Sequence, residues 1–169
     1  DAITTMLNAY GLGAERAADV SDWLFTVVMR GKTTFGQLAP NIGKVATIAA
    51  SAGVGMDELG ASIATLTRSG IQTEEAITAI NAVMSTFLKP SAEGAELARQ
   101  LGFSLDVATL EGEGLIGVFK RISQLPPDAI ATLFPNIRAM KGVLPALRNM
   151  QGFAEDVAAM GNRAGATGE

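Results

Sequence analysis

Apolar side chains recur along most of this chain at the spacing of one face of an α-helix. Within each stripe they follow the i, i+3, i+4, i+7 rule, and no stretch alternates as a half-buried strand would. The stripes are Val20, Trp23, Leu24, Val27 and Val28; Met56, Leu59, Ile63 and Leu66; Ile77, Ile80, Val83, Met84, Phe87 and Leu88; and Leu115, Val118, Phe119, Ile122 and Leu125. The sequence therefore predicts an all-α fold, a compact domain of about eight to ten short helices.

Polar residues mark the expected helix starts. Thr34 followed by Gln37 makes a capping box, in which each side chain can satisfy a free backbone N–H. Thr73 precedes two glutamates and Ser91 precedes Glu93, which gives a hydroxyl cap and first-turn carboxylates. Glycines stand where the helices should end and would supply the left-handed residue that commonly closes a last turn. These glycines are Gly31, Gly53, Gly70 and Gly102.

The stripes and caps together predict the helix boundaries. The longest loop should be residues 102–113, which end beside Gly114. Pro145 should kink or split the helix that contains it, because proline has no backbone N–H to donate. The expected helices are 14–30, 34–39, 40–52, 56–69, 74–88, 92–101, 114–125, 128–134, 135–150 and 152–160.

The apolar positions at the centres of the stripes should form the core. We expect Trp23 and the methionines to be buried with them rather than to bind a cofactor. The residues expected to be mostly buried are Leu59, Ile63, Leu66, Ile77, Ile80, Met84, Phe87, Phe119 and Ile122.

The chain contains neither histidine nor cysteine. Histidine is the commonest general base and transition-metal ligand, and cysteine supplies thiolate nucleophiles, thiolate metal sites and disulfides. Carboxylates alone could hold a hard cation, but no run has the alternating acidic spacing of a calcium loop. We therefore expect a protein that is not an enzyme, with no catalytic, cofactor-binding or metal-binding residues.

Two glycine motifs resemble nucleotide-binding loops but lack required residues. Gly31-Lys32-Thr33-Thr34 looks like the end of a phosphate-binding loop, yet Thr26 stands where a glycine is needed and a helical stripe precedes it. Gly53-Val54-Gly55 lacks the third glycine of a dinucleotide fingerprint, because Glu58 occupies that position. Both motifs are better explained as the end of one helix followed by the start of the next.

A helix-turn-helix could in principle be built from residues 34–52 and 56–69. From Arg30 to Val54 there are three basic residues and no acidic ones. The second helix, however, would begin with Asp57-Glu58, at the end that faces bases and phosphates in this motif. Since the net charge is also −4, we expect no nucleic-acid site.

Charged side chains are unevenly distributed. Residues 55–113 carry nine acidic and three basic side chains, whereas residues 114–154 carry five basic and one acidic. Either these charges lie on solvated faces, or they make complementary contacts between segments or neighbouring subunits. The pairs Asp57-Glu58 and Glu74-Glu75 are better explained as first-turn carboxylates than as an acid–base pair.

Hydrophobic residues make up 48% of the chain, which raises the question of membrane contact. The longest uncharged runs have 13 residues, for example Ala76–Leu88. A spanning helix needs roughly 18 or more. A helical domain that lies on or perturbs membranes stays open as an alternative function.

A series of short motifs runs through the chain in a definite order. It includes an alanine-rich segment before an aspartate, a hydroxyl-rich turn, a small-residue helix and an acidic helix start. The motifs are Ala17-Ala18-Asp19-Val20, Thr33-Thr34-Phe35-Gly36-Gln37-Leu38, Ala46 to Glu58, Ile63-Ala64-Thr65-Leu66-Thr67-Arg68-Ser69-Gly70-Ile71, Glu75-Ala76, Phe87-Leu88-Lys89-Pro90-Ser91 and Leu101-Gly102-Phe103. Over roughly residues 15–150 this series resembles the core region of phage tail tape measure proteins.

The resemblance implies a structural role. Tape measure proteins are long, largely helical chains that occupy the tail tube, set tail length during assembly and are expelled at infection. It implies a module involved in tail length determination, tail assembly and genome ejection. The module would lie in the virion tail and, during assembly, in the cytoplasm of the bacterial host. The expected contacts are with tube, assembly chaperone and tail tip proteins, or with further copies of the chain.

The resemblance also suggests a division of the chain. Residues 1–13 would be the end of a preceding helical segment, and residues 14–151 the tape measure core domain. Residues 152–169 would be the start of a following helix and a linker.

Overall fold

The computed structural model describes residues 1–138, 140 and 142–167, and no strand occurs among them. The structure is 74% helical, so the predicted all-α fold is confirmed. The helices are α1 (Ala2–Ala9), η1 (Ala14–Arg16), α2 (Ala17–Arg30), α3 (Phe35–Leu38), η2 (Ala39–Asn41), α4 (Ile42–Ser51), α5 (Met56–Arg68), α6 (Thr73–Leu88), α7 (Ala92–Gln100), α8 (Val107–Ser123), α9 (Pro127–Leu133), α10 (Pro135–Arg138), α11 (Val143–Arg148) and α12 (Phe153–Gly161).

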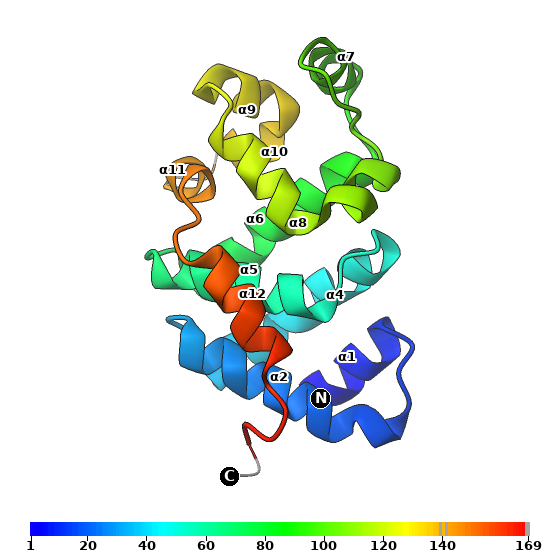
Figure 1. Ribbon diagram of the computed structural model, residues 1–169, viewed down its shortest axis with the longest axis vertical. Coiled ribbons are helices and arrows are strands. Elements are labelled where there is room, and N and C mark those ends of the chain that lie inside the picture. The colour runs from blue at the N-terminus through cyan, green and yellow to red at the C-terminus, as the bar shows by residue number, and fades with distance from the viewer. Residues whose placement is uncertain (139, 141, 168–169) are drawn as a thin grey trace.

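Helix α5 lies at the centre of the molecule. It packs against α2, α6 and α12, and the remaining helices surround these four (Figure 1). All of residues 59–67 are buried, so α5 has no solvent-facing side along more than two turns. A helix buried on every side belongs in the interior of a larger helical domain.

The buried hydroxyls of α5 are satisfied within the helix itself. Ser62 donates to the Glu58 carbonyl oxygen at 2.7 Å, and the one hydroxyl proton of Thr65 is shared between the Ala61 carbonyl oxygen at 2.8 Å and the Asp156 carboxylate at 2.5 Å. Thr67 donates to the Ile63 carbonyl oxygen at 2.8 Å. These bonds to the preceding turn remove the cost of burying an unpaired polar group, so α5 can occupy the core although it carries hydroxyls.

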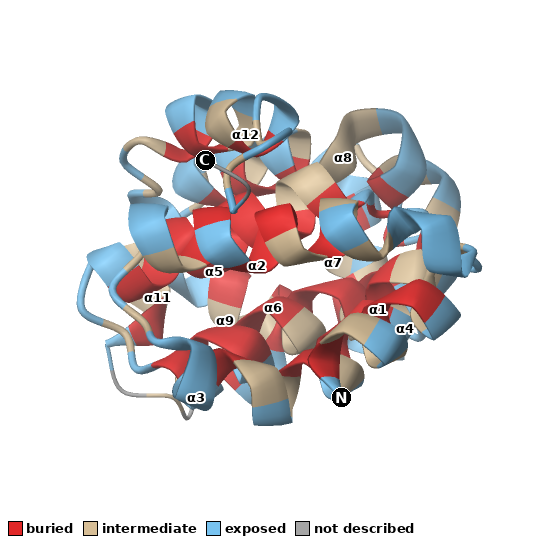
Figure 2. Ribbon diagram, turned by 90° about the horizontal axis from the view of Figure 1, so that it is seen from below, coloured by how far each residue is buried: buried red, intermediate tan, exposed pale blue. Residues whose placement is uncertain are grey.

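The expected core is confirmed. All nine predicted residues are buried, and so is Trp23. The methionines were expected to be buried too; Met6, Met56, Met84 and Met160 are, but Met29 is 68% exposed, so the expectation was wrong for Met29. The buried faces of the helices turn toward one another and the exposed faces turn outward (Figure 2).

Truncating Leu66 to alanine should lower the free energy of unfolding by about 2–5 kcal/mol, because its fully buried side chain would leave a cavity. The measurement is chemical denaturation followed by circular dichroism. Leu88→Ala serves as the control, since Leu88 on the neighbouring α6 is 39% exposed. Equal effects of the two substitutions would show that the assignment of helix faces is wrong.

Two of the predicted side-chain caps are formed. The Thr34 hydroxyl accepts the Gln37 N–H at 3.1 Å, and the Ser91 hydroxyl accepts the Gly94 N–H at 2.9 Å. The prediction for Thr73 was wrong. Thr73 is the first residue of α6, and its hydroxyl lies 2.6 Å from that of Thr33 in a hydrogen bond between the two side chains.

Three of the four helix-ending glycines have the expected left-handed backbone, with φ of 74°, 105° and 94° at Gly53, Gly70 and Gly102. Gly31 does not, because its φ is −95°. A Cβ on Gly31 would lie 2.6 Å from Thr67 Oγ1 and 2.9 Å from the backbone of Ala64. Glycine is needed there because α2 ends in close contact with α5.

The predicted loop over residues 102–113 was largely wrong. Helix α8 already begins at Val107, where the Asp106 carboxylate caps it by accepting the Thr109 N–H at 2.8 Å. Gly114, with φ of 69°, interrupts the helix without ending it. The glycine was correctly identified as a break, but the helical turns before it were missed.

The predicted helix over residues 135–150 was also wrong in its details. The chain forms α10 and α11 with a break between them, and Gly142 immediately before α11 has φ of 81°. Pro145 falls in the first turn of α11, where a backbone N–H would have no helical partner. Part of the predicted helix, residues 139 and 141, lies outside the described residues.

Both ends of the chain pack on the rest of the molecule. Helix α1 contacts α4 and α2 and buries Met6 and Leu7, while α12 contacts α5 and α2 and buries Phe153 and Met160. The division at residues 13 and 152 stays a prediction.

Candidate functional site

The nucleotide-binding motifs rejected from the sequence occupy structural positions. Gly31 to Thr34 connect α2 to α3, and the Lys32 N–H donates to the Thr67 hydroxyl at 3.1 Å. Gly53 to Gly55 connect α4 to α5. Each motif follows a helix, whereas the binding loops that they resemble follow a strand.

Helix α5 would be the recognition helix of a helix-turn-helix built from residues 34–52 and 56–69. Because residues 59–67 are all buried, α5 has no face that could enter a DNA groove. The carboxylates at its start make contacts within the fold. Asp57 pairs with Arg163, and Glu58 accepts the Ile116 N–H at 3.0 Å.

No group of three or more metal-ligating side chains comes together among the described residues. No helix in the described part of the chain is both long and apolar enough to cross a membrane. The expectation that the chain has no catalytic, cofactor-binding or metal-binding residues stays a prediction.

The best-defined polar cluster surrounds Asp156 on α12, whose side chain is fully buried. Arg30 donates to Asp156 Oδ1 at 3.0 Å, and Arg68 donates to Oδ1 at 3.0 Å and to Oδ2 at 2.6 Å. Thr65 adds a bond to Oδ2 at 2.5 Å. The Asp156 carboxylate raises the pKa of the Arg68 guanidinium above its ordinary value. The cluster joins α12 to α2 and α5.

A second cluster holds the residues after α12 against α2. The Asp22 carboxylate accepts the Thr167 hydroxyl at 2.5 Å, the Thr167 N–H at 2.9 Å and the Gly165 N–H at 3.0 Å. These bonds, those from Thr167 above all, hold the pKa of Asp22 below its ordinary value. Arg163 similarly lowers the pKa of Asp19 through a hydrogen bond at 2.9 Å. We call α12 with residues 162–167 the C-terminal strap.

The sequence did not reveal either cluster. The partners of Asp156 are 88 and 126 residues away, and Thr167 is 145 residues from Asp22. The only local signal was that Asp156 falls on the apolar side of α12 with Phe153 and Met160, where an aspartate needs a partner.

An exposed apolar surface lies on α2 and α3. Phe25 is 43% exposed, Met29 68% and Phe35 56%. We call these three residues the apolar patch. Two of them, Phe25 and Phe35, line a hollow of about 240 Å³ together with Ile3 of α1 and Thr167 of the C-terminal strap. Phe25 and Met29 lie off the stripe that α2 turns to the core, although Met29 was expected to be buried.

The sequence profile of the phage-related minor tail proteins matches residues 1–160. The chain belongs to this family. It is also similar to a protein of Pneumococcus phage Dp-1 described as a tape measure protein, with 28% identity over 104 residues. That match covers 62% of this chain and 9% of the phage Dp-1 protein, so the chain corresponds to a small part of its relative. No solved structure matches the chain.

Membership of the phage minor tail protein family indicates a structural role in a phage tail. The resemblance to tape measure proteins is confirmed. A structural tail family also agrees with the expectation that the chain is not an enzyme.

Proposed function

We propose that the chain is a folded structural module of a tape measure protein and takes part in tail length determination, tail assembly and genome ejection. The similarity to the phage Dp-1 tape measure protein is the observation that carries the proposal. During assembly the module would be in the host cytoplasm, and in the finished particle it would be in the tail.

The module does not itself measure length. A single helix of the whole chain would reach about 250 Å at 1.5 Å per residue. The longest described helices have 16 and 17 residues, and the longer one is interrupted at Gly114. Because the chain folds back on itself, its contribution is a docking surface within a longer protein.

The apolar patch is the surface best suited to contact another tail protein. Large exposed apolar side chains that lie together lose their contact with water when a partner covers them. The proposed partners are tube, assembly chaperone and tail tip proteins, with a second copy of the chain as the remaining candidate.

A Met29→Gln/Phe35→Gln variant should bind its tail partner at least about tenfold more weakly, since two apolar side chains lose their burial at the interface. Binding to the purified tube, chaperone and tail tip proteins of the same phage is measured by calorimetry. Sedimentation at several concentrations measures self-association.

The matched control is Leu88→Gln/Leu101→Gln, which changes two comparably apolar, exposed residues at 39% and 42% exposure elsewhere on the surface. A wild-type chain that stays monomeric and ignores all these tail proteins contradicts the docking function. Co-sedimentation with liposomes at physiological salt, lost in the patch variant, would instead favour the membrane-interacting alternative.

A further inference from the structure

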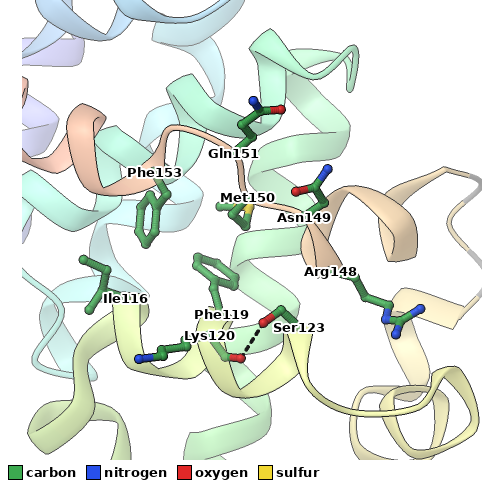
Figure 3. A pocket seen from close by; sticks show the side chains of 9 residues that line it. All are labelled: Ile116, Phe119, Lys120, Ser123, Arg148, Asn149, Met150, Gln151 and Phe153. Atoms are coloured by element: carbon green, nitrogen blue, oxygen red, sulfur yellow. Dashed lines mark hydrogen bonds between the residues drawn. The ribbon is translucent and has the colours of Figure 1, made fainter.

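A groove beside Phe153, at the start of the C-terminal strap, combines an aromatic floor with a basic rim. It lies between α8 and the connection from α11 to α12, and its volume is about 260 Å³ (Figure 3). The rings of Phe119 and Phe153 meet edge to face with their centres 5.4 Å apart. Ile116 extends this apolar floor and is 42% exposed.

The connection between α11 and α12 forms one wall of the groove. Asn149 ends α11 with a non-helical backbone, and Gly152 before α12 has φ of 83°, which favours glycine. A hydrogen bond of 2.8 Å from the Gln151 N–H to the Asn149 carbonyl oxygen tightens the turn. The side chains of Asn149 and Gln151 therefore stand at the edge of the groove, as Figure 3 shows.

The charged side chains that line the groove are both basic. Lys120 and Arg148 are both exposed and lie on either side of Phe119 in Figure 3. No acidic side chain lines the groove, and neither cation has an ion-pair partner among the described residues. Glu113, the nearest acidic residue on α8, pairs with Arg121. On α12, Asp156 pairs with Arg30 and Arg68, and the exposed Glu155 does not line the groove.

Among the described side chains of this basic segment, Arg121 is the cation that has an ion-pair partner. Of the ion pairs among the described residues, one joins the acidic segment 55–113 to the basic segment 114–154, the pair of Glu113 with Arg121 at 2.5 Å. Among the described residues, the complementary contact between the two segments thus consists of this ion pair. Lys120 and Arg148 remain available for charges brought by another molecule.

We propose that this groove binds an acidic segment of a partner protein through one bulky apolar side chain and flanking carboxylates. The apolar side chain would cover Ile116, which is exposed beside the buried rings of Phe119 and Phe153. The carboxylates would meet Lys120 and Arg148, and the amides of Asn149 and Gln151 can donate to and accept from an extended peptide backbone. The groove and the apolar patch share no residues, so a result that contradicts one proposal leaves the other standing.

A peptide fits the groove better than other anionic molecules. A nucleic acid would need a longer basic track, and the chain as a whole has a net charge of −4. A lipid surface would meet only two cations beside a recessed aromatic floor. The test therefore also measures binding of a nucleic acid and of lipid vesicles.

The probe is a short fluorescent peptide of glutamates around a central phenylalanine, and anisotropy reports its binding to the chain. A Lys120→Glu/Arg148→Glu variant should bind it at least about tenfold more weakly, since two attractions become repulsions. Raising the salt to about 0.5 M should weaken binding severalfold, because exposed charge pairs are screened. Replacing the central phenylalanine by serine should also weaken binding.

The matched control is Lys44→Glu/Lys89→Glu, which changes the net charge equally at two exposed lysines outside the groove. Melting temperatures confirm that both variants fold. The proposal is overturned if both variants bind the glutamate peptide alike, or if a peptide with lysines in place of the glutamates binds as well. It is also overturned if phosphatidylserine vesicles or single-stranded DNA bind more tightly with the same dependence on Lys120 and Arg148.

Discussion

Replacing Asp156 by alanine is expected to lower the free energy of unfolding by about 3 kcal/mol. The carboxylate is fully buried and accepts hydrogen bonds from Arg30, Arg68 and Thr65. Removing one partner of a buried ion pair typically costs about 3–5 kcal/mol, because the other charge is left uncompensated. Here the arginine side chains are 40% and 39% exposed and can regain water, so the lower end of that range applies.

The loss should be concentrated in the C-terminal strap. The Asp156 cluster joins α12 to α2 and α5, so its removal should let α12 open before the rest of the domain unfolds. Hydrogen exchange would show faster exchange at the α12 amides than at those of α6. Glu155→Gln is the matched control, because Glu155 is an exposed carboxylate in the same first turn. Equal destabilisation by the two substitutions would mean that the cluster does not hold the strap.

Replacing Trp23 by alanine should be at least as damaging, at about 3–5 kcal/mol. Trp23 is fully buried, and its indole N–H donates to the Met56 carbonyl oxygen at 2.7 Å. Its ring lies against Gly60, where an added Cβ would come within 2.8 Å of the indole nitrogen. The substitution would leave a large cavity between α2 and α5 and remove the second hydrogen bond of the Met56 carbonyl group, which keeps its helical bond within α5.

A Trp23→Phe variant separates the two contributions. It keeps much of the buried ring but removes the N–H, so it should cost about 1 kcal/mol, the typical net contribution of one hydrogen bond. Denaturant unfolding measures both variants. If Trp23→Phe lowers the free energy of unfolding as much as Trp23→Ala does, the cavity adds nothing and the packing explanation is wrong.

The sequence correctly determined the features that depend on a few neighbouring residues. The helical stripes predicted the all-α fold and all nine core residues, because one face of a helix is defined by residues within two turns. The caps at Thr34 and Ser91 were found for the same reason, since cap and acceptor are three residues apart. The absence of histidine and cysteine narrows the possible chemistry, because these residues supply the commonest general base and the thiolate nucleophile.

The helix boundaries predicted from the sequence were wrong in two regions, where the local pattern allowed more than one arrangement of helices. Val107 to Glu113 look like a loop because Gly112 and Gly114 lie at their end, yet Asp106 caps them into helical turns that kink at Gly114. The apolar pattern over residues 135–150 is continuous, but Gly142 breaks it before Pro145 can. Propensity alone does not decide such cases, because packing against neighbouring helices supplies most of the stability of a short helix.

Only the tertiary structure decided which helix became the centre and which residues became a site. Periodicity gave α5 one apolar face, but its small residues and self-bonded hydroxyls allow helices to cover its other sides as well. The partners of Asp156 and Asp22 lie 88 to 145 residues away. The groove arises where α8 meets a connection that follows it by about 30 residues. Local sequence patterns specify the helices, whereas contacts between distant residues exist only after the chain has folded, because folding is what brings their side chains together.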